Sequence, residues 1–424
     1  MRICFLSRRF FPAISGMSVY AANLLRELAA NGHDLTMISQ YRADPAGALI
    51  YGGGPPPEVP GVRVIGLEST GEQAVNRGGP ADFEADLLAM VETICHEHDR
   101  QGPFDLIHAQ YGYPNGLAAL EAGRRLALPV VVSIQGGDGH WVGSCCRTHR
   151  DAMRAVLEHS GALLIGSASF AAEVAANNGV DPARFTIVSG ATDTTQFHPR
   201  ADRDPGTLGD PPTLLYHGRV DARKGVIELV DAVGILRDAG RSFRAIISGI
   251  GPAVDAVAAR VRALDLGGVV ELSGYAPYEQ AAEVYRRGNI FLSPTYSEGF
   301  SNTILEAMAT GLPIVSARAV GVVDCLVDGA NGLLVEPGDA VVLASAVARL
   351  LDDDPLRIRL ARRGLDDIRR LYGWPAVAGR IEQAYRSVIG RPTGSTWLST
   401  YDPGVVSVAY ADPSCRFRSE PHLL

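Results

Sequence analysis

The chain has 424 residues, of which 46% are hydrophobic and 20% are charged. This composition excludes a disordered, collagen-like or low-complexity protein and predicts about two to three globular domains. The 39 Lys and Arg residues against 47 Asp and Glu residues give a net charge of -8, which argues against a general binder of nucleic acids or anionic membranes. Any bound phosphate group must therefore be held by a local cluster of cations.

The hydropathy and the cysteine pattern predict a cytoplasmic protein. No apolar run approaches the roughly 18 residues of a membrane-spanning helix, and the stretch before Arg8 is too short for a secretory signal. The six cysteines lack the regular spacing of a disulfide framework, so we expect reduced thiols. We expect no nucleic-acid partner and no stable membrane insertion, and the oligomeric state stays open, a homodimer included.

Short runs rich in Val, Ile and Leu alternate along the chain with longer amphipathic segments, which predicts an α/β fold with parallel sheets. Helices are expected between most of these runs, for example at 19–30 and 225–239. The runs interpreted as strands form a first group at 3–7, 35–39, 62–65, 106–108, 130–134, 163–166 and 185–188 and a second group at 214–217, 245–248, 269–273, 290–293 and 314–316.

The stretch between the two groups of strands is polar and rich in Pro and Gly, which is typical of a linker between domains. Two open α/β domains bind ligands outside the carboxyl ends of their strands, so functional residues are expected in the loops that follow strands. The predicted parts are an N-terminal Rossmann-like domain at 1–200, a linker at 201–212, a C-terminal Rossmann-like domain at 213–373, a terminal helix at 374–390, and a tail at 391–424 that is packed along the surface or partly disordered.

The strongest functional signal follows the predicted strand at 290–293. Glu298 and Glu306 are separated by seven residues and bracket a helix start, for which Ser301 is a good N-cap. The backbone N–H groups of the first turn, at 302–304, are unpaired and carry the positive end of the helix dipole, which suits an anionic phosphate. The two glutamates can then accept hydrogen bonds from hydroxyl groups on either side of that phosphate.

This segment resembles the Glu-x7-Glu motif of the family 4 retaining glycosyltransferases, which use nucleotide-sugar donors. The resemblance implies an α/β GT-B fold, with two facing Rossmann-like domains and an inter-domain cleft. It implies that the domain at 1–200 is the acceptor side, that the domain at 213–373 binds the nucleotide sugar, and that the terminal helix at 374–390 crosses back to the first domain. It implies that Glu298 bonds hydroxyls of the donor sugar and that Glu306 holds the ribose hydroxyls. Further donor-site residues implied at the loop and the helix start are Gly299, Phe300, Ser301, Asn302 and Thr303.

A second match strengthens this resemblance. Arg219 and Lys224 follow the first strand of the second domain, where two cations beside a helix N-terminus can neutralise a diphosphate. They resemble the family's Arg and Lys, which stabilise the leaving nucleoside diphosphate, and with Glu298 they form the predicted catalytic set. The resemblance implies that these cations replace a bound metal, so no cofactor is expected beyond the nucleoside-diphosphate sugar as co-substrate.

The N-terminal half matches the family less fully. Gly16 stands where the family usually has a Gly-Gly loop under the donor phosphate, and a plain turn is an equal interpretation. Gln135 stands where many relatives carry a histidine, which puts a catalytic histidine in doubt. Gln110 likewise stands where a His-x-His pair is common, and His108 is expected to pack at a strand end rather than to act as a base. Gln135 and His108 stay candidate contacts of the sugar or the acceptor.

Residues 139–150 hold two histidines and two adjacent cysteines, Cys145 and Cys146. A metal site is one interpretation, but adjacent cysteines are poorly placed to ligate one zinc ion, and the spacing matches no strong zinc pattern. We therefore predict no metal. The segment is interpreted either as an acceptor-binding loop, with Trp141 and Arg147 as contacts, or as the loop that begins a helix.

The function expected from these signals is that of a retaining, hexosyl-type glycosyltransferase with a small soluble acceptor. The negative charge and the absence of a basic amphipathic face favour an aminocyclitol, an inositol or a thiol over a lipid. The resemblance allows a role in specialised metabolism, including mycothiol- or lincosamide-like pathways. The alternatives are a glycosyltransferase of cell-surface polysaccharide assembly, a GT-B sugar-nucleotide epimerase or phosphorylase, and a silent nucleotide-sugar binding protein.

Overall fold

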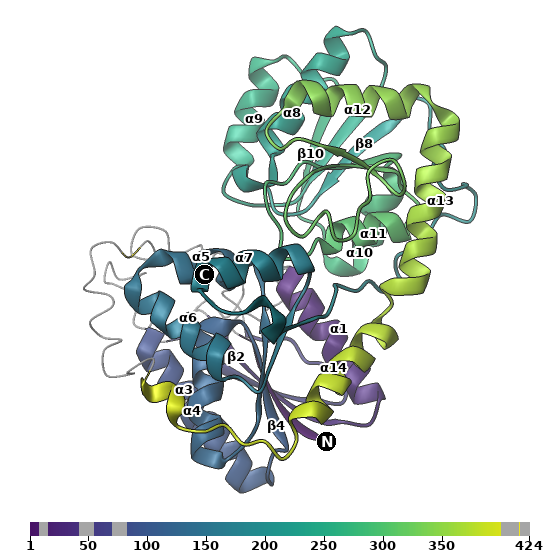
Figure 1. The fold of residues 1–424 in the computed structure, drawn as a ribbon. Coiled ribbons are helices and arrows are strands. Elements are labelled where there is room, and N and C mark those ends of the chain that lie inside the picture. The colour runs from purple at the N-terminus through teal and green to yellow at the C-terminus, as the bar shows by residue number, and fades with distance from the viewer. Residues whose placement is uncertain (8–15, 42–54, 70–82, 400–414, 416–424) are drawn as a thin grey trace. The chain divides into compact units, whose positions relative to one another are not determined.

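A computed structural model describes residues 1–7, 16–41, 55–69, 83–399 and 415 of the chain (Figure 1). These residues form two compact units. Unit 1 comprises the described residues of Met1–Ser189 and Val377–Leu424, and unit 2 comprises Gly190–Ala376. Each unit is built on a parallel sheet flanked by helices, so the predicted α/β class with two Rossmann-like domains is confirmed.

Unit 1 contains, within the described residues, a seven-stranded parallel sheet in the order β3-β2-β1-β4-β5-β6-β7. Every strand overlaps one of the seven predicted runs, because central strands such as β1 and β5 are almost wholly buried and therefore read as largely apolar sequence. The strands are β1 Arg2–Ser7, β2 Asp34–Tyr41, β3 Val62–Glu68, β4 Leu106–Gln110, β5 Val130–Ile134, β6 Ala162–Ile165 and β7 Phe185–Ile187.

Helices connect these strands in the manner of a crossover fold, and α1 confirms the helix predicted at 19–30. The helices of unit 1 are α1 Gly16–Ala30, α3 Phe83–Gln101, α4 Leu117–Leu126, α5 Gly136–Cys145, α6 Arg147–His159 and α7 Ala168–Asn178, with single turns at Gly112–Gly116 and Pro182–Arg184.

The C-terminal part of the chain belongs to unit 1. Helix α14, Trp374–Val388, carries Tyr385, which is fully buried in the core of this unit. Beyond α14, the Thr393 N–H donates to the carbonyl of Leu128 at 3.1 Å, and Trp397 in the turn Thr396–Ser399 is 1% exposed. The first residues of the predicted tail are therefore packed, whereas the part from residue 400 onward, apart from Cys415, lies outside the described residues.

Unit 2 contains, in the stretch described without gaps from 190 to 376, a six-stranded parallel sheet in the order β10-β9-β8-β11-β12-β13. Five of these strands overlap predicted runs. The sixth, β13, has no predicted counterpart. The strands are β8 Thr213–His217, β9 Arg244–Ser248, β10 Val270–Gly274, β11 Ile290–Ser293, β12 Ile314–Ala317 and β13 Leu333–Val335.

The sheet of unit 2 is covered on both faces. Leu214 and Tyr216 of β8 pack into one apolar cluster, with residues of α8, α9 and α12, whereas Leu215 packs into a second cluster with α10 and α11. This alternation follows from the pleat, which turns successive side chains to opposite faces. The helices are α8 Val226–Asp238, α9 Val254–Ala263, α10 Tyr278–Arg287, α11 Asn302–Ala309, α12 Ala340–Asp352 and α13 Asp354–Leu371, preceded by a turn at Ala222–Lys224.

The stretch expected to be a linker, 201–212, groups with unit 2. Although it is mostly polar, it is tied to the unit by hydrogen bonds and by Leu208, which packs against the core of the unit. The buried guanidinium of Arg357 donates from Nε to the carbonyl of Gly206 at 2.7 Å, and just upstream Phe197 is fully buried. The boundary between the units consequently falls at residues 189 and 190.

In the part of the chain that is described, the helices are too short or too polar to cross a membrane.

Candidate active site

The residues expected to bind a donor lie at the carboxyl ends of β8 and β11. These two strands are neighbours, and the strand order of the sheet reverses between them. Such a reversal is where open α/β sheets bind ligands. One loop, 218–225, leads from β8 to α8, and the other, 294–301, leads from β11 to α11. The fold thus brings together the two segments with the strongest sequence signals.

Asp221 organises the loop after β8. Its buried carboxylate accepts hydrogen bonds from the backbone N–H of Arg223 at 3.0 Å and from Nη2 of Arg223 at 2.7 Å, and it lies 3.3 Å from Nε of Arg219. Burial acts to raise the pKa of Asp221, but the hydrogen bonds from Arg223 and the charges of both arginines outweigh it and lower the pKa to about 2. The carboxylate is therefore ionised at neutral pH and anchors the Arg219 guanidinium.

Gly225 allows the two loops to approach each other closely. It has a φ of 68° as the N-cap of α8, and a Cβ atom at this position would lie 2.0 Å from the carbonyl oxygen of Pro294. Both the left-handed backbone and the short separation require glycine. The loops are also joined where the N–H of Tyr296 donates to the carbonyl of Arg223 at 3.0 Å.

Lys224 and Glu298 form an ion pair between the loops, with Nζ 2.7 Å from Oε1. Their side chains are 27% and 18% exposed, so solvent screens the pair only in part. The backbone of Glu298 is fixed because its N–H donates to the carbonyl of Val320 at 2.9 Å. Next to it, Gly321 has a φ of 76°, and a Cβ there would lie 2.3 Å from the carbonyl oxygen of Glu298. An ammonium group and a carboxylate are thus held together at the edge of the sheet.

The start of α11 directly follows this loop. The side chain of its N-cap, Ser301, does not cap a backbone N–H of the first turn, and its Oγ forms a hydrogen bond of 3.3 Å with Oγ1 of Thr303 instead. Asn302 has a buried Oδ1 that finds no hydrogen-bond partner among the described residues. The first turn therefore offers backbone N–H groups and the positive end of the helix dipole to an anion.

Glu306 lies one helical turn further along α11 and is 8% exposed. Its Oε2 accepts a hydrogen bond of 2.7 Å from the hydroxyl of Tyr285, and the Tyr285 ring contacts the ring of His217, at the end of β8, edge-on. Burial raises the pKa of Glu306 to about 7, against the opposing effect of the Tyr285 hydrogen bond. Glu306 is therefore more enclosed than Glu298.

In unit 1 the structure removes His108 from the candidate contacts. The side chain is fully buried in β4, with Nδ1 2.6 Å from the hydroxyl of Tyr385 and Nε2 2.8 Å from Oγ of Ser133. Burial lowers the pKa of His108 to about 3, so the ring is neutral. It packs in the interior, as expected, and cannot reach an acceptor.

The two glutamines that replace expected histidines have different surroundings. Gln110 is 1% exposed and ties β1 to α1, because its Oε1 accepts from Oγ of Ser7 at 2.9 Å and its Nε2 donates to the carbonyl of Met17 at 3.1 Å. Gln135 is half-buried at the N-cap of α5, and its backbone N–H donates to Oδ1 of Asp138 at 2.8 Å. Gln135 thus lies at the end of β5, where α5 begins.

Three other predicted contacts lie at helix starts or on helices. Gly16 begins α1 and is exposed, with no atom within 4 Å of a Cβ added there. Trp141 is half-buried in α5. Arg147 begins α6 with a 93% exposed side chain, 3.7 Å from Asp151. The segment 139–150 is thus a pair of successive helices rather than a loop.

Sequence reasoning missed residues that act by positioning others. Asp221 and Asp138 are buried carboxylates that fix the loops after β8 and β5. Asp221 is the N-cap of the turn Ala222–Lys224 and Asp138 is the third residue of α5, so helix capping was an available signal. Cys415, which lies beside Cys145, Cys146 and His149, was also missed. It is 266 positions from His149 and could not be paired from sequence.

Comparisons with known proteins cover both units. A family model described as "Glycosyl transferase 4-like domain" matches residues 15–191, and one described as "Glycosyl transferases group 1" matches residues 199–366. The D-inositol 3-phosphate glycosyltransferase of Corynebacterium efficiens is 26% identical over 87% of this chain and 90% of the relative. A glycogen synthase of Mycobacterium tuberculosis is 26% identical over 91% of this chain and 94% of the relative.

Solved structures share the fold at lower identity. The sucrose-phosphate synthase of Thermosynechococcus elongatus has a TM-score of 0.75 at 24% identity, over 92% of this chain and 99% of that one. Anabaena HepE, solved in complex with UDP and glucose, has a TM-score of 0.72 at 15% identity, over 91% and 99% of the two chains. These likenesses concern the fold.

Proposed function

Because this chain belongs to the family 4-type glycosyltransferases with the GT-B fold, we propose that it moves a sugar from a nucleoside-diphosphate donor to a small soluble acceptor, with retention of configuration. The observation that carries the proposal is the Lys224–Glu298 ion pair between the loops after β8 and β11, beside the start of α11. A nucleotide sugar needs this combination, because its diphosphate requires cations and N–H donors while its sugar requires hydrogen-bond acceptors.

Each side chain of the site has a role in donor binding. Lys224 has three N–H donors, so it can bind a phosphate oxygen while it stays paired with Glu298. Arg219, held by Asp221, presents a guanidinium to the diphosphate. Glu298 accepts from a sugar hydroxyl, and Glu306 accepts from the ribose hydroxyls beside its bond to Tyr285. The donor is further lined by Gly299, Phe300, Ser301, Asn302 and Thr303.

The transfer is a same-side substitution at the anomeric carbon. The bond from this carbon to the donor phosphate oxygen breaks, a bond to the acceptor atom forms on the same face, and the acceptor proton passes to the leaving phosphate. Arg219, Lys224 and the start of α11 stabilise the charge that develops on that phosphate. We therefore propose that the reaction requires no general base from the protein and no bound metal or other cofactor.

A cyclitol is the acceptor class that the relatives favour. The C. efficiens relative is named for D-inositol 3-phosphate and aligns over most of both chains. Glucan assembly is the second candidate, because a glycogen synthase aligns over a similar share at the same identity. Transfer assays with both acceptor classes separate the two candidates.

The test begins with thermal stabilisation of the full chain by a panel of nucleoside diphosphates and their sugars, since a ligand specific to the native state raises Tm. The stabilising donor is then incubated with myo-inositol, an inositol phosphate, an aminocyclitol, a low-molecular-weight thiol and glycogen. Transfer to a cyclitol, with the donor's anomeric configuration kept in the product by NMR, supports the proposal. An inverted product contradicts retention, and transfer to glycogen alone selects the second candidate.

Other outcomes separate the remaining alternatives. Donor consumption without an acceptor indicates an epimerase or a phosphorylase, and donor binding without turnover on any acceptor indicates a silent binding protein. The cofactor proposal is tested by omitting Mg²⁺ and Mn²⁺ from the assay. Turnover should be unchanged, and a strict requirement for either ion would overturn the assignment of the charge-stabilising role to Arg219 and Lys224.

A further inference from the structure

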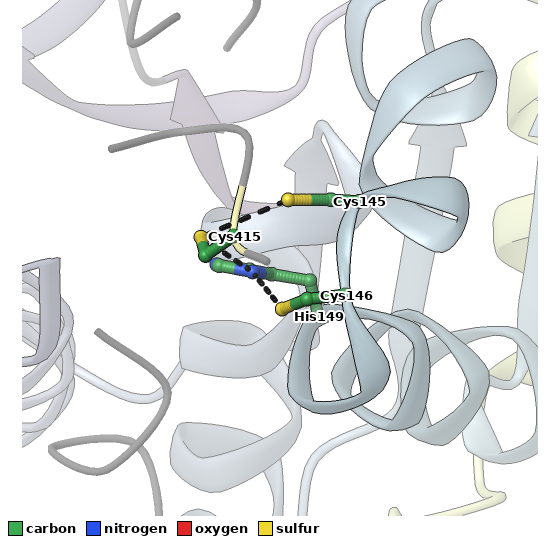
Figure 2. A group of neighbouring side chains, drawn as sticks. All are labelled: Cys145, Cys146, His149 and Cys415. Atoms are coloured by element: carbon green, nitrogen blue, oxygen red, sulfur yellow. Dashed lines mark hydrogen bonds between the residues drawn. The ribbon is translucent and has the colours of Figure 1, made fainter. Parts of the chain in front are cut away.

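Four side chains that commonly bind metals meet in the interior of unit 1. Cys145, Cys146, His149 and Cys415 are all buried, and one ligand atom from each lies within 4.8 Å of the others (Figure 2). Sγ of Cys145 is 3.8 Å from Sγ of Cys415, which is 3.7 Å from Nδ1 of His149. Sγ of Cys146 is 3.0 Å from the same Nδ1. The donor set is therefore three sulfur atoms and one imidazole nitrogen.

We propose that these four residues bind one Zn²⁺ ion. Structural zinc is tetrahedral, with Zn–S distances of about 2.3 Å and Zn–N distances of about 2.0 Å, so its sulfur atoms are separated by about 3.8 Å and its sulfur and nitrogen atoms by about 3.5 Å. The distances from Sγ of Cys415 to Sγ of Cys145 and to Nδ1 of His149 match these separations. The shorter contact between Cys146 and His149 must lengthen by about half an ångström when the ion enters.

Adjacent cysteines are in general poorly placed to ligate one zinc ion. The break between α5 and α6 allows Cys145 and Cys146 to share one site. Cys145 ends α5, whereas Cys146 has an extended backbone, with φ -155° and ψ 173°, and is the N-cap of α6. In Figure 2 both side chains lie on the side of the chain that faces Cys415. His149 follows in the first turn of α6.

The chemistry of the donors selects the metal and its role. Thiolates and imidazole favour zinc over the hard cations Mg²⁺ and Ca²⁺. Four protein ligands leave no open position for water or substrate, so the site is structural rather than catalytic. Binding takes up Zn²⁺ and releases three thiol protons, with no change of oxidation state, and leaves the centre with one net negative charge.

The proposed ion fixes a distant part of the chain to unit 1. Cys415 is 270 positions from Cys145 in sequence, so the metal closes a long loop and holds residue 415 against the α5–α6 junction. This junction lies at the end of α5, whose N-cap is Gln135 at the end of β5. Zinc would therefore stabilise the helix pair that follows the predicted acceptor-side strand, without touching the donor site in unit 2.

The experiment uses the full chain, purified under reducing conditions without chelator and then incubated with Zn²⁺ and desalted. Elemental analysis should find about one zinc per chain. Co²⁺ in place of zinc should give the thiolate charge-transfer band and the intense visible bands of a tetrahedral site. Cys415→Ser, Cys146→Ser and His149→Ala should each lose most of the zinc. The matched control is Cys95→Ser, which changes a half-buried cysteine on α3 of the same unit and should keep full occupancy.

Folding of each variant is checked by far-ultraviolet circular dichroism and by the rise in Tm that a nucleoside diphosphate causes, which reports on unit 2. Three results would overturn the proposal. The first is absence of bound zinc in the folded parent chain after reconstitution. The second is a Cys145–Cys415 disulfide in protein purified with reductant, seen as a mass two hydrogens lower. The third is unchanged zinc in Cys415→Ser. None of these results depends on catalytic activity, so the donor-site proposal stands or falls separately.

Discussion

Lys224 forms an ion pair with Glu298 and is also proposed to bind the diphosphate of the donor. Lys224→Ala removes a cation and also leaves an unpaired carboxylate next to the phosphate. We expect nucleoside-diphosphate affinity to fall at least tenfold and turnover to fall about 100-fold or more. In the double variant Lys224→Ala/Glu298→Gln the repulsion is gone, so the diphosphate should bind more tightly than to Lys224→Ala alone, while turnover stays low. Titration calorimetry and initial rates measure both effects.

The matched control for Lys224→Ala is Arg349→Ala, which removes an exposed cation from the last turn of α12 in the same unit. Its affinity and turnover should equal those of the parent chain. If Lys224→Ala binds and turns over the donor like this control, the phosphate assignment is wrong.

The raised pKa of Glu306 predicts that the stability of the folded chain depends on pH. Burial raises its pKa from 4.5 to about 7, so between these values the folded chain keeps a proton that the unfolded chain has lost. The stability contributed by this group is complete below pH 4.5 and is lost as pH rises to 7, by at most about 1.4 kcal/mol per pH unit. Glu306→Gln has no carboxyl group to titrate at this position. The Tm of this variant minus the Tm of the parent should therefore be larger at pH 8 than at pH 5.

The comparison of Glu306→Gln with the parent isolates one carboxyl group, because burial raises the pKa of Asp138 to about 7 in both proteins and its effect cancels. Glutamine can still accept the Tyr285 hydrogen bond through its amide oxygen. An equal Tm difference at the two pH values would show that Glu306 is ionised in the folded chain already at pH 5.

At the scale of the elements, the donor site depends on how closely the loop after β8 approaches the loop after β11. Gly225→Ala would put a Cβ 2.0 Å from the carbonyl oxygen of Pro294 and force the loops apart. We expect a lower Tm together with a loss of nucleoside-diphosphate binding. Gly240→Ala is the control, because Gly240 has a similar φ of 74° and no atom within 4 Å of an added Cβ.

The two glycine variants share the cost of a left-handed alanine, about 1–2 kcal/mol, and differ in the contact with Pro294. Gly240→Ala should therefore lose some thermal stability and keep its affinity for the diphosphate. Equal affinity in the two variants would mean that the loop separation does not control donor binding. Thermal unfolding with and without ligand measures both quantities.

The elements that sequence predicted well are those whose signal is local. Buried strands such as β1 and β5 read as apolar runs, and α11 begins at a recognisable N-cap. The strand β13 has no counterpart among the predicted runs. The stretch 201–212 was read as a linker because it is polar and rich in Pro and Gly, whereas hydrogen bonds such as that from Arg357 to Gly206 and the packing of Leu208 against the core attach it to unit 2.

The candidate site was predictable where function needs particular residue types at fixed spacing, as for Lys224 and Glu298. The supporting contacts were not, since the bond of Tyr285 to Glu306 and the fit of Gly225 against Pro294 join segments whose proximity only the fold establishes. His108 was expected to pack at the end of a strand, whereas it packs in the middle of β4 beside Tyr385, which lies 277 positions away. Such long-range pairs leave no local pattern in a single sequence.

At the scale of the whole molecule, the two proposed binding sites lie in different units. Arg219, Lys224, Glu298 and Glu306 all belong to Gly190–Ala376, whereas the cysteine and histidine cluster belongs to unit 1. A nucleoside diphosphate should therefore slow hydrogen exchange most strongly in peptides of unit 2 that contain 218–225 and 296–306. At a concentration 100 times Kd, a ligand bound only to the native state contributes about 2.7 kcal/mol against global unfolding.

Hydrogen-exchange mass spectrometry of the full chain, with and without the diphosphate that raises Tm most, tests this division. The matched nucleoside without phosphates is the control and should protect the same peptides weakly, because it lacks the groups that Arg219, Lys224 and the start of α11 bind. Protection concentrated in unit 1 would contradict the assignment of the diphosphate to the loops after β8 and β11. Equal protection by the nucleoside and the diphosphate would instead show that these cations contribute little to binding.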